Sequence, residues 1–488
     1  MNIWRAKEEI KDTVQAYLWK DAWGNYEIPA IRQRPLLLIG PPGVGKTQIM
    51  EQVARECKIG LVAYTITHHT RQSAVGLPMI EKRQYGGREY SVTEYTMSEI
   101  VGAVYDKMEA TGLKEGILFI DEINCVSETL APAMLQFLQC KTFGTHRIPD
   151  GWLIIAAGNP PEYNKSVREF DVVTLDRIRR MDIEPDFGVW KEYAYQEKIH
   201  PAIVSYLNIK KQNFCQIETT VDGRRFVTPR GWEDLSHLIL VYEKTGKKVD
   251  REVVAQYIQH PKIAKDFANY LLLYEKYQKD YQVEEILSGK VNNAVYPKIE
   301  RAAFDERLSL TGLLLAKLNG NFEGVYWQER VIKGVREVLQ QFEEAEGADG
   351  IEKLSSLLNQ RERERKQLIK QEVLGRREDM LRKKILGKLE EYRTGLMKDR
   401  KGDAWSRLKE MFSEDAGAYE EDFAKAGQKL EHGFDFMEAA FGDSQEMVIF
   451  VTELNTNPFA MHFLKEYECE RYFEYNRNLL FDVLPGER

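Results

Sequence analysis

One segment constrains the possible folds of this chain more than any other, and it reads Gly40-Pro41-Pro42-Gly43-Val44-Gly45-Lys46-Thr47. It fits the pattern G-x-x-x-x-G-K-[ST] at every fixed position. The apolar run Leu36–Ile39 before it predicts a buried strand, and Lys46–Cys57 after it has the pattern of a helix. Glycines let a backbone turn tightly and direct N–H groups at phosphate oxygens, and the positive end of the following helix faces the same anion. The segment therefore predicts a phosphate-binding loop, in which Lys46 reaches the β- and γ-phosphates and Thr47 ligates Mg²⁺.

Further apolar runs alternate with helical patterns in the first part of the chain, at residues 61–66, 117–120, 153–157 and 181–183. Strands that are apolar along their whole length and separated by helices indicate a parallel sheet covered on both faces. We therefore expect an α/β nucleotide-binding domain over residues 1–186. Two helical regions follow, at 187–282 and 283–488, and the second is expected to be a separate all-α domain.

Two carboxylates, Asp121 and Glu122, follow the apolar run 117–120. Open α/β sheets bind ligands beyond the carboxyl ends of their strands, so this pair is expected near the phosphate-binding loop. Asp121 would hold Mg²⁺ through its coordination shell. Glu122 would act as a general base on a water molecule. The alternative is a strand end whose carboxylates are only solvated.

Asn159 follows the apolar run 153–157 in a similar way. Its amide would orient the attacking water beside Glu122. By itself, Asn-Pro after a strand indicates a turn, but the two other motifs favour the catalytic interpretation. The expected chemistry is hydrolysis of ATP with Mg²⁺.

Charge and cysteine usage disfavour several classes of protein. The formal net charge is −8, whereas proteins that neutralise many phosphates usually have a basic face. No apolar stretch approaches the roughly 18 residues of a membrane span, and the N-terminus lacks the apolar core of a signal peptide. The five scattered cysteines are typical of reduced thiols. We therefore expect a cytoplasmic protein with no membrane partner.

Two hairpins and two charged blocks complete the pattern. Gly86-Gly87 separates two runs of strand-forming residues and predicts a two-residue turn. A smaller hairpin is expected over 140–148, turning near Gly144. The stretch 352–401 is basic and amphipathic, and the chain becomes acidic after Trp405. These opposite blocks either pair within the chain, serve a partner, or form two solvated helical faces.

Together the motifs resemble those of AAA+ ATPases, and over residues 30–280 several details resemble the MoxR branch. Asp121-Glu122-Ile123-Asn124 is similar to its extended Walker B segment, although Cys125 stands where an arginine is common. Gly158-Asn159-Pro160 resembles its sensor-1 segment, which more usually reads Gln-Asn-Pro. Leu175-Asp176-Arg177-Ile178 is similar to its Leu-Asp-Arg-Phe segment. Thr228-Pro229-Arg230-Gly231 resembles the Ser-Pro-Arg of its sensor 2.

The resemblance implies a five-stranded parallel sheet, a helical lid at 187–282, and a hexameric ring with ATP between subunits. Arg177 would be the arginine finger that acts on the next subunit's γ-phosphate, with Arg179 or Arg180 as substitutes. The alternative for all three is a surface salt bridge. Arg230 would contact the γ-phosphate from the lid of its own subunit.

The resemblance also implies partners. The two hairpins would face the ring pore or a client, with His146 and Arg147 as contact residues, or they are solvated loops. The C-terminal region is similar to tails of MoxR-like ATPases that act with a von Willebrand A-like partner.

The favoured function is an ATP-driven remodeller that acts on a protein client as a chaperone or in cofactor insertion. A nucleic-acid motor is an alternative, which the basic stretch 361–401 favours slightly and the acidic total opposes. Another alternative is a scaffold that assembles on ATP and turns over slowly. The full set of Lys46, Asp121, Glu122 and Asn159 argues for turnover.

Overall fold

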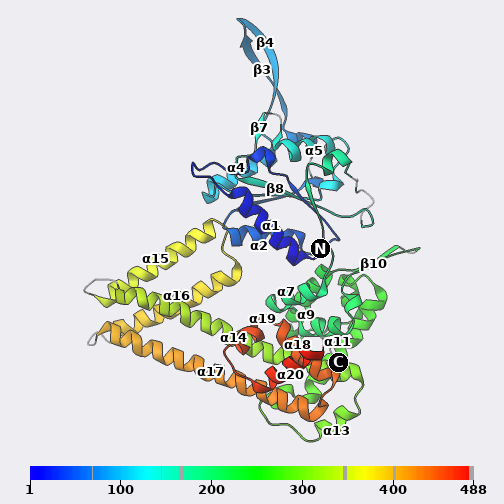
Figure 1. Cartoon of the computed structure of the whole chain (residues 1–488), viewed down its shortest axis with the longest axis vertical. Coiled ribbons are helices and arrows are strands. Elements are labelled where there is room, and N and C mark those ends of the chain that lie inside the picture. The colour runs from blue at the N-terminus through cyan, green and yellow to red at the C-terminus, as the bar shows by residue number, and fades with distance from the viewer. Residues whose placement is uncertain are drawn as a thin grey trace. The chain divides into compact units, whose positions relative to one another are not determined.

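The computed structural model describes residues 1–68, 70–143, 145–163, 167, 170–221, 223–344, 349–398 and 403–482. The chain forms two compact units (Figure 1). The first contains Met1–Asp186 and Arg363–Asp379, and the second contains Phe187–Glu362 and Met380–Arg488. The first unit is an α/β structure, and the second is predominantly helical.

A five-stranded sheet lies at the centre of the first unit. Its strands, in spatial order, are β2 (Gly60–Thr65), β5 (Gly116–Asp121), β8 (Trp152–Gly158), β1 (Leu36–Ile39) and β9 (Arg179–Asp182). Every neighbouring pair in this sheet is parallel. The predicted parallel sheet is therefore confirmed, and only the bounds of the strands differ slightly from those expected.

Helices cover both faces of this sheet. They are α1 (Ile3–Leu18), α2 (Lys46–Cys57), α3 (Arg71–Val75), α4 (Glu99–Thr111), α5 (Ala131–Cys140) and α6 (Val172–Leu175). Because successive side chains of a strand point to opposite faces, β1 contributes to two cores. Leu36 and Leu38 pack with residues of α1 and α2, whereas Leu37 and Ile39 pack with residues of α4 and α5. The fully apolar strands of the sequence are thus explained by burial on both sides.

Two antiparallel hairpins extend the first unit. The strands β3 (Pro78–Tyr85) and β4 (Arg88–Tyr95) join through Gly86 and Gly87, whose φ angles are 58° and 80°. Positive φ at both turn residues is the geometry of a type I′ turn, which confirms the predicted hairpin. It projects from the sheet (Figure 1), and every residue of β3 is exposed.

The second hairpin pairs β6 (Thr142–Phe143) with β7 (His146–Arg147). The expected turn residue, Gly144, lies outside the described residues. His146 Nε2 is 2.9 Å from the carbonyl oxygen of Tyr95, so the first residue of β7 lies beside the last residue of β4.

Helices make up most of the chain after Asp186. They are α7 (Phe187–Gln196), α8 (Pro201–Ile209), α9 (Pro229–Thr245), α10 (Arg251–Tyr257), α11 (Pro261–Tyr281), α12 (Val283–Leu287), α13 (Val295–Glu300), α14 (Phe304–Glu344), α15 (Gly350–Lys370), α16 (Arg376–Lys398), α17 (Ala404–Phe441), α18 (Gln445–Thr456), α19 (Pro458–Leu464) and α20 (Glu470–Asp482). The facing ends of α15 and α16 belong to the first unit. In the second unit one hydrophobic cluster extends from Trp190 to Tyr472. The segments 187–282 and 283–488 therefore share a core.

The region 187–282 differs from the helical pattern expected for it. A short antiparallel hairpin, β10 (Gln216–Thr220) with β11 (Gly223–Val227), interrupts the helices. Ile217, Thr219 and Thr220 in one strand are β-branched, and such side chains favour extended backbone. The segment is short and mostly polar, so hydrophobic periodicity did not reveal it.

A satellite core joins α14, α15, α16 and α17 in the second unit. It contains Leu354, Leu358, Leu389, Tyr392 and Leu396, whose helical spacing is visible in the basic stretch of the sequence. The basic and acidic blocks also touch here, because Lys388 Nζ is 3.0 Å from Asp415 Oδ1. Tyr392 donates a hydrogen bond of 2.7 Å to the other oxygen of the same carboxylate. The basic and acidic blocks therefore pair in part with each other within the chain.

Among the residues that the structure describes, no helix is both long enough and apolar enough to cross a membrane.

Candidate active site

The carboxyl ends of three adjacent strands bring the predicted motifs together. In the parallel register Ile39 of β1 lies opposite Gly158 of β8, and Ile120 of β5 lies opposite Ala156 of β8. The Gly40 N–H donates a hydrogen bond of 3.3 Å to the Gly158 carbonyl. The phosphate-binding loop, the acidic pair and Asn159 therefore begin at one edge of the sheet.

The loop from Gly40 to Thr47 has the backbone that its glycines permit. Gly43 and Gly45 have φ angles of 79° and 93°, in the left-handed region that side chains disfavour. A Cβ at Gly40 would lie 2.7 Å from the carbonyl oxygen of Ile183, so this position needs glycine for a different reason. Helix α2 begins directly after Gly45, whose lack of a side chain leaves the first N–H groups of the helix for another acceptor. An anion fits that position.

Lys46 is held in a defined place although its side chain is long. The residue is 8% exposed. Its Nζ donates to the carbonyl oxygens of Gly40 and Pro41, at 2.7 and 2.9 Å, and to Asn159 Oδ1, at 3.1 Å. Oxygen acceptors compensate a buried ammonium. The lysine thus connects the phosphate-binding loop to the end of β8.

The two residues predicted to ligate Mg²⁺ are in contact. Thr47 Oγ1 donates a hydrogen bond of 3.1 Å to Asp121 Oδ2. A hydroxyl oxygen and a carboxylate oxygen form a hard donor set, which is the kind that Mg²⁺ prefers. The residues therefore fit this ion, which in P-loop enzymes also binds phosphate oxygens.

Glu122 lies beside Asp121 in an unusual backbone conformation. Its φ angle is 58°, which places a non-glycine residue in the left-handed region. Such a conformation costs about 1–3 kcal/mol and occurs often at active sites. The Glu122 N–H donates to Asp121 Oδ1 at 2.9 Å, and Thr67 Oγ1 donates to Glu122 Oε2 at 2.9 Å. These contacts orient a carboxylate that is only partly buried.

Asn124 connects the acidic segment to the end of β8. Its Nδ2 donates to the Asn159 carbonyl at 2.8 Å, and its Oδ1 accepts from the Asn159 N–H at 3.3 Å. Asn124 is 5% exposed. A Cβ at Gly158 would lie 2.4 Å from Asn124 Oδ1. Gly158 stands where glutamine is more usual in the family that the sequence resembles. Its missing side chain leaves the space that Asn124 occupies.

The three candidate finger arginines have different surroundings. Arg179 donates to Glu9 Oε1 at 2.7 Å and to Thr13 Oγ1 at 2.9 Å, both on α1. Arg180 pairs with Asp182 at 2.8 Å. Arg177 lies on the surface between α6 and β9 and hydrogen-bonds to Gln139. Among the described residues, no hydrogen bond joins Arg177 to the phosphate-binding loop of its own chain. The role of Arg177 as an arginine finger stays a prediction.

Arg230 lies in the second compact unit, exposed in the first turn of α9. Thr228 caps that helix by accepting a hydrogen bond of 3.2 Å from the Gly231 N–H. The sensor-2 role of Arg230 stays a prediction.

Two residues of this site, Thr67 and Asn124, have no role that the sequence pattern predicts. Thr67 follows β2 in a short 3₁₀ helix (Ile66–His68). Thr67 lies two residues beyond the end of β2, and Thr65, the last residue of β2, pairs with Asp121. This position after a strand was the available signal that Thr67 could lie at the site. For Asn124 the available signal was a polar residue close after an apolar run that is expected to be buried. Neither signal names a contact partner without the fold.

Comparison with known protein families identifies the type of domain in the first unit. A family described as AAA domain (dynein-related subfamily) matches residues 35–178, from the start of β1 to just before β9. This part of the chain is thus an AAA domain. No curated protein matches the chain. A crystal structure from Cytophaga hutchinsonii ATCC 33406, described as a putative ATPase, is similar at 15% sequence identity with a TM-score of 0.24. The likeness covers 40% of this chain and 57% of that one.

Substitution of Gly158 by alanine tests the packing of Asn124. The added Cβ would displace the Asn124 amide and with it the backbone of Asn159. Misplacement by about 1 Å near reacting groups can cost about 100-fold in rate, so we expect ATP hydrolysis by Gly158→Ala to fall at least about tenfold. Phosphate release at saturating ATP measures the effect.

The matched control is Gly102→Ala on α4, where the nearest atom to an added Cβ is 3.9 Å away. This variant is expected to hydrolyse ATP at the wild-type rate. Wild-type activity in Gly158→Ala would show that the contact with Asn124 has no part in the site.

Proposed function

We propose that this chain is an ATP-hydrolysing remodeller of the MoxR type, which acts on a protein client as a chaperone or in cofactor insertion. One observation carries the proposal: at the carboxyl edge of the sheet in the AAA domain, Lys46 contacts Asn159, and Asp121 contacts both Thr47 and the Glu122 N–H. Lys46, Thr47 and Asp121 are the residue types that P-loop NTPases use for phosphates and Mg²⁺. Glu122 is suited to act as a general base, and Asn159 to position a water.

The proposed reaction is attack of a water oxygen on the γ-phosphorus of ATP, with cleavage of the bond to the β-phosphate oxygen. Glu122 accepts the proton of the water as the oxygen attacks, and ADP leaves with the electron pair of the broken bond. Lys46 and the N–H groups at the start of α2 stabilise negative charge on the phosphates. When bound, Mg²⁺ supplies further positive charge to phosphate oxygens. Thr47 and Asp121 are the residues that would hold it.

Asn159 has a positioning role in this proposal. Its Oδ1 accepts from Lys46, while its backbone is fixed on both sides by Asn124. The amide Nδ2 is then directed by the same rotamer toward another acceptor, and the attacking water is the proposed one. A fixed amide lowers the entropy cost of placing that water in line with the γ-phosphorus.

Removal of the base tests the chemistry. Glu122→Gln keeps the shape of the side chain but cannot accept the proton at neutral pH. We expect it to bind ATP with wild-type affinity and to hydrolyse it at least about 100-fold more slowly. A fluorescent ATP analogue measures binding, and phosphate release measures turnover. Unchanged turnover would mean that another group activates the water.

An arginine finger supplied by a neighbouring copy is the proposed completion of this site. Arg179 is bound to α1 and Arg180 to Asp182, so Arg177 is the best placed of the three to leave its own surface. A cation that arrives across an interface makes hydrolysis depend on assembly, and such fingers contribute about 10³–10⁵ in rate. A hexameric ring is the assembly that the family resemblance implies.

Mixed assemblies test this arrangement. Arg177→Ala and Lys46→Ala are each expected to be inactive alone, because one lacks the finger and the other lacks the phosphate contact. Mixing them creates interfaces with a native Arg177 beside a native Lys46, so activity is expected to return in part. If phosphate release stays at background at every mixing ratio, the finger does not act between copies.

The exposed β3–β4 hairpin favours a protein client over a nucleic acid. Its exposed apolar or aromatic residues include Ile80, Tyr85 and Tyr90, and the segment buries almost nothing of its own. Such surface is typical of protein contacts. In the basic stretch, Arg365 pairs with Asp379 at 2.6 Å and Lys388 pairs with Asp415, which reduces the charge available to phosphates. A von Willebrand A-like protein is the client or partner proposed from the family resemblance.

The Glu122→Gln variant also tests the client. In the presence of ATP it should stay in one nucleotide state and retain what it binds, which mass spectrometry then identifies. The same capture with Tyr85→Ser and Tyr90→Ser added should lose that protein if the hairpin makes the contact. Equal capture with and without these changes would exclude the hairpin as the client surface.

A further inference from the structure

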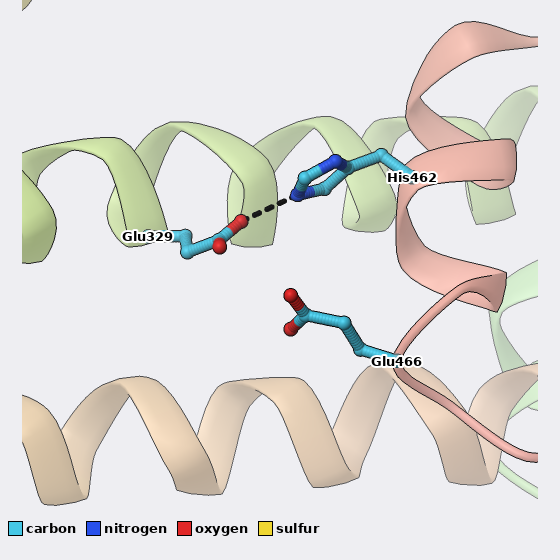
Figure 2. A group of neighbouring side chains, drawn as sticks. All are labelled: Glu329, His462 and Glu466. Atoms are coloured by element: carbon cyan, nitrogen blue, oxygen red, sulfur yellow. Dashed lines mark hydrogen bonds and ion pairs between the residues drawn. The ribbon is translucent and has the colours of Figure 1, made fainter.

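Three potential metal ligands converge in the second unit, and none of them has been given a role above. They are Glu329 on α14, His462 on α19, and Glu466 just beyond the end of α19 (Figure 2). One donor atom from each residue lies within 4.8 Å of the other two. His462 Nε2 is 2.5 Å from Glu329 Oε2. Figure 2 shows all three side chains directed into the same space between the helices.

Apolar packing fixes the elements that carry these residues. Phe463 stacks on Phe322 of α14, with ring centroids 4.6 Å apart. Tyr326 of α14 meets the His462 ring edge-on at 4.9 Å and Phe459 of α19 at 5.3 Å. His462 and Glu466 are four residues apart, a spacing that brings side chains to one side of a helical turn. The two helices therefore present their donors to each other as a consequence of core packing.

Glu329 is the anchor of the cluster because it is 5% exposed. Burial acts to raise the pKa of Glu329, but hydrogen bonds from Lys333 and His462 outweigh it and hold that pKa below its usual value. Lys333 and His462 therefore hold the Glu329 carboxylate from two sides. Its two oxygens are divided, since Oε1 faces Lys333 and Oε2 faces the cluster. One oxygen thus remains available as a ligand while the lysine keeps the other.

Glu466 brings a second negative charge to the same place. It is exposed, and no hydrogen bond or ion pair of its carboxylate to another described residue is found. The field of the two carboxylates reaches Tyr419 on α17, where burial and the charges of Glu329 and Glu466 raise the pKa to about 12. Two carboxylates this close repel each other, which favours a cation beside them. Lys333 pairs with the outer oxygen of Glu329 and interacts with both carboxylates, and it leaves the side that faces His462 open to a second cation.

We propose that Glu329, His462 and Glu466 form a binding site for a divalent transition-metal ion, with Zn²⁺ as the ion that fits best. One imidazole nitrogen and two carboxylate oxygens are donors that Zn²⁺ accepts, and three protein ligands leave a fourth position for water. Bonds of about 2.0–2.1 Å at tetrahedral angles put donors about 3.4 Å apart. The distance of 2.5 Å between His462 Nε2 and Glu329 Oε2 is shorter than that value, and the three donor atoms all lie within 4.8 Å of one another, so side-chain shifts of about 1 Å suffice.

This site differs in kind from the magnesium site proposed at the AAA domain. Mg²⁺ prefers oxygen ligands in octahedral geometry, whereas an imidazole nitrogen favours Zn²⁺ and its neighbours among the transition metals. A bound ion would join α14 to α19, because one ligand comes from the former and two from the latter and its end. Its expected consequence is greater stability of the second unit, since a ligand that binds only the folded state stabilises that state.

Zinc titration of the full chain tests the proposal. The protein is stripped with a chelator, kept free of nucleotide and titrated with ZnCl₂ by calorimetry, and thermal unfolding is followed in parallel. We expect one zinc ion to bind at this site and the unfolding temperature to rise. Glu466→Gln and His462→Gln should each weaken that binding at least about tenfold and remove the rise.

The matched control is Glu468→Gln, another exposed glutamate two residues along. It should bind zinc as the wild type does. Circular dichroism checks that each variant folds, and the exposed position of Glu466 makes its substitution the least disruptive of the ligand changes. No zinc binding by the wild type overturns the proposal, and so does equal binding by the wild type, Glu466→Gln and His462→Gln, which would place the ion elsewhere, for example on an exposed thiol such as Cys140.

Discussion

Parallel pairing of β1 with β8, and of β8 with β5, is the constraint on which the candidate active site depends. It brings the residues after Ile39, Ile120 and Gly158 to one edge, although they are far apart in sequence. At that edge the buried ammonium of Lys46 donates to the Asn159 amide, and the Asp121 carboxylate accepts from the Thr47 hydroxyl and the Glu122 N–H. Close neighbours restrict two positions at this edge to glycine. Ile183 leaves no room for a side chain at Gly40, and Asn124 leaves none at Gly158. A change at a residue that touches no substrate is therefore expected to alter the chemistry.

Much of this arrangement could be predicted from the sequence. Continuous apolar runs such as Leu36–Ile39 have few alternatives to a parallel sheet, and a glycine-rich loop between strand and helix leaves little doubt about phosphate binding. The Gly86-Gly87 hairpin was also predictable, because two successive glycines readily adopt the positive φ angles that a two-residue turn needs. These features are set by neighbours in sequence, and the sequence contains those neighbours.

The rest depends on contacts between distant residues. Thr67 touches Glu122 only because β2 pairs with β5, and Asn124 bonds Asn159 only because β5 pairs with β8. Nothing near His462 indicates Glu329, which precedes it by more than a hundred residues. The polar β10–β11 hairpin has too little apolar periodicity to stand out among helices. In each case the local pattern is compatible with several outcomes, and tertiary pairing selects one.

The residues around Lys46 are proposed to hydrolyse ATP. Phosphate release by the purified wild-type chain with ATP and Mg²⁺, compared with Lys46→Ala over a range of protein concentrations, tests this proposal most directly. We expect turnover by the wild type that rises more than linearly with concentration as copies assemble, and a residual activity in Lys46→Ala below about 1%. Turnover that is unaffected by Lys46→Ala, or no wild-type turnover at any concentration, would contradict it.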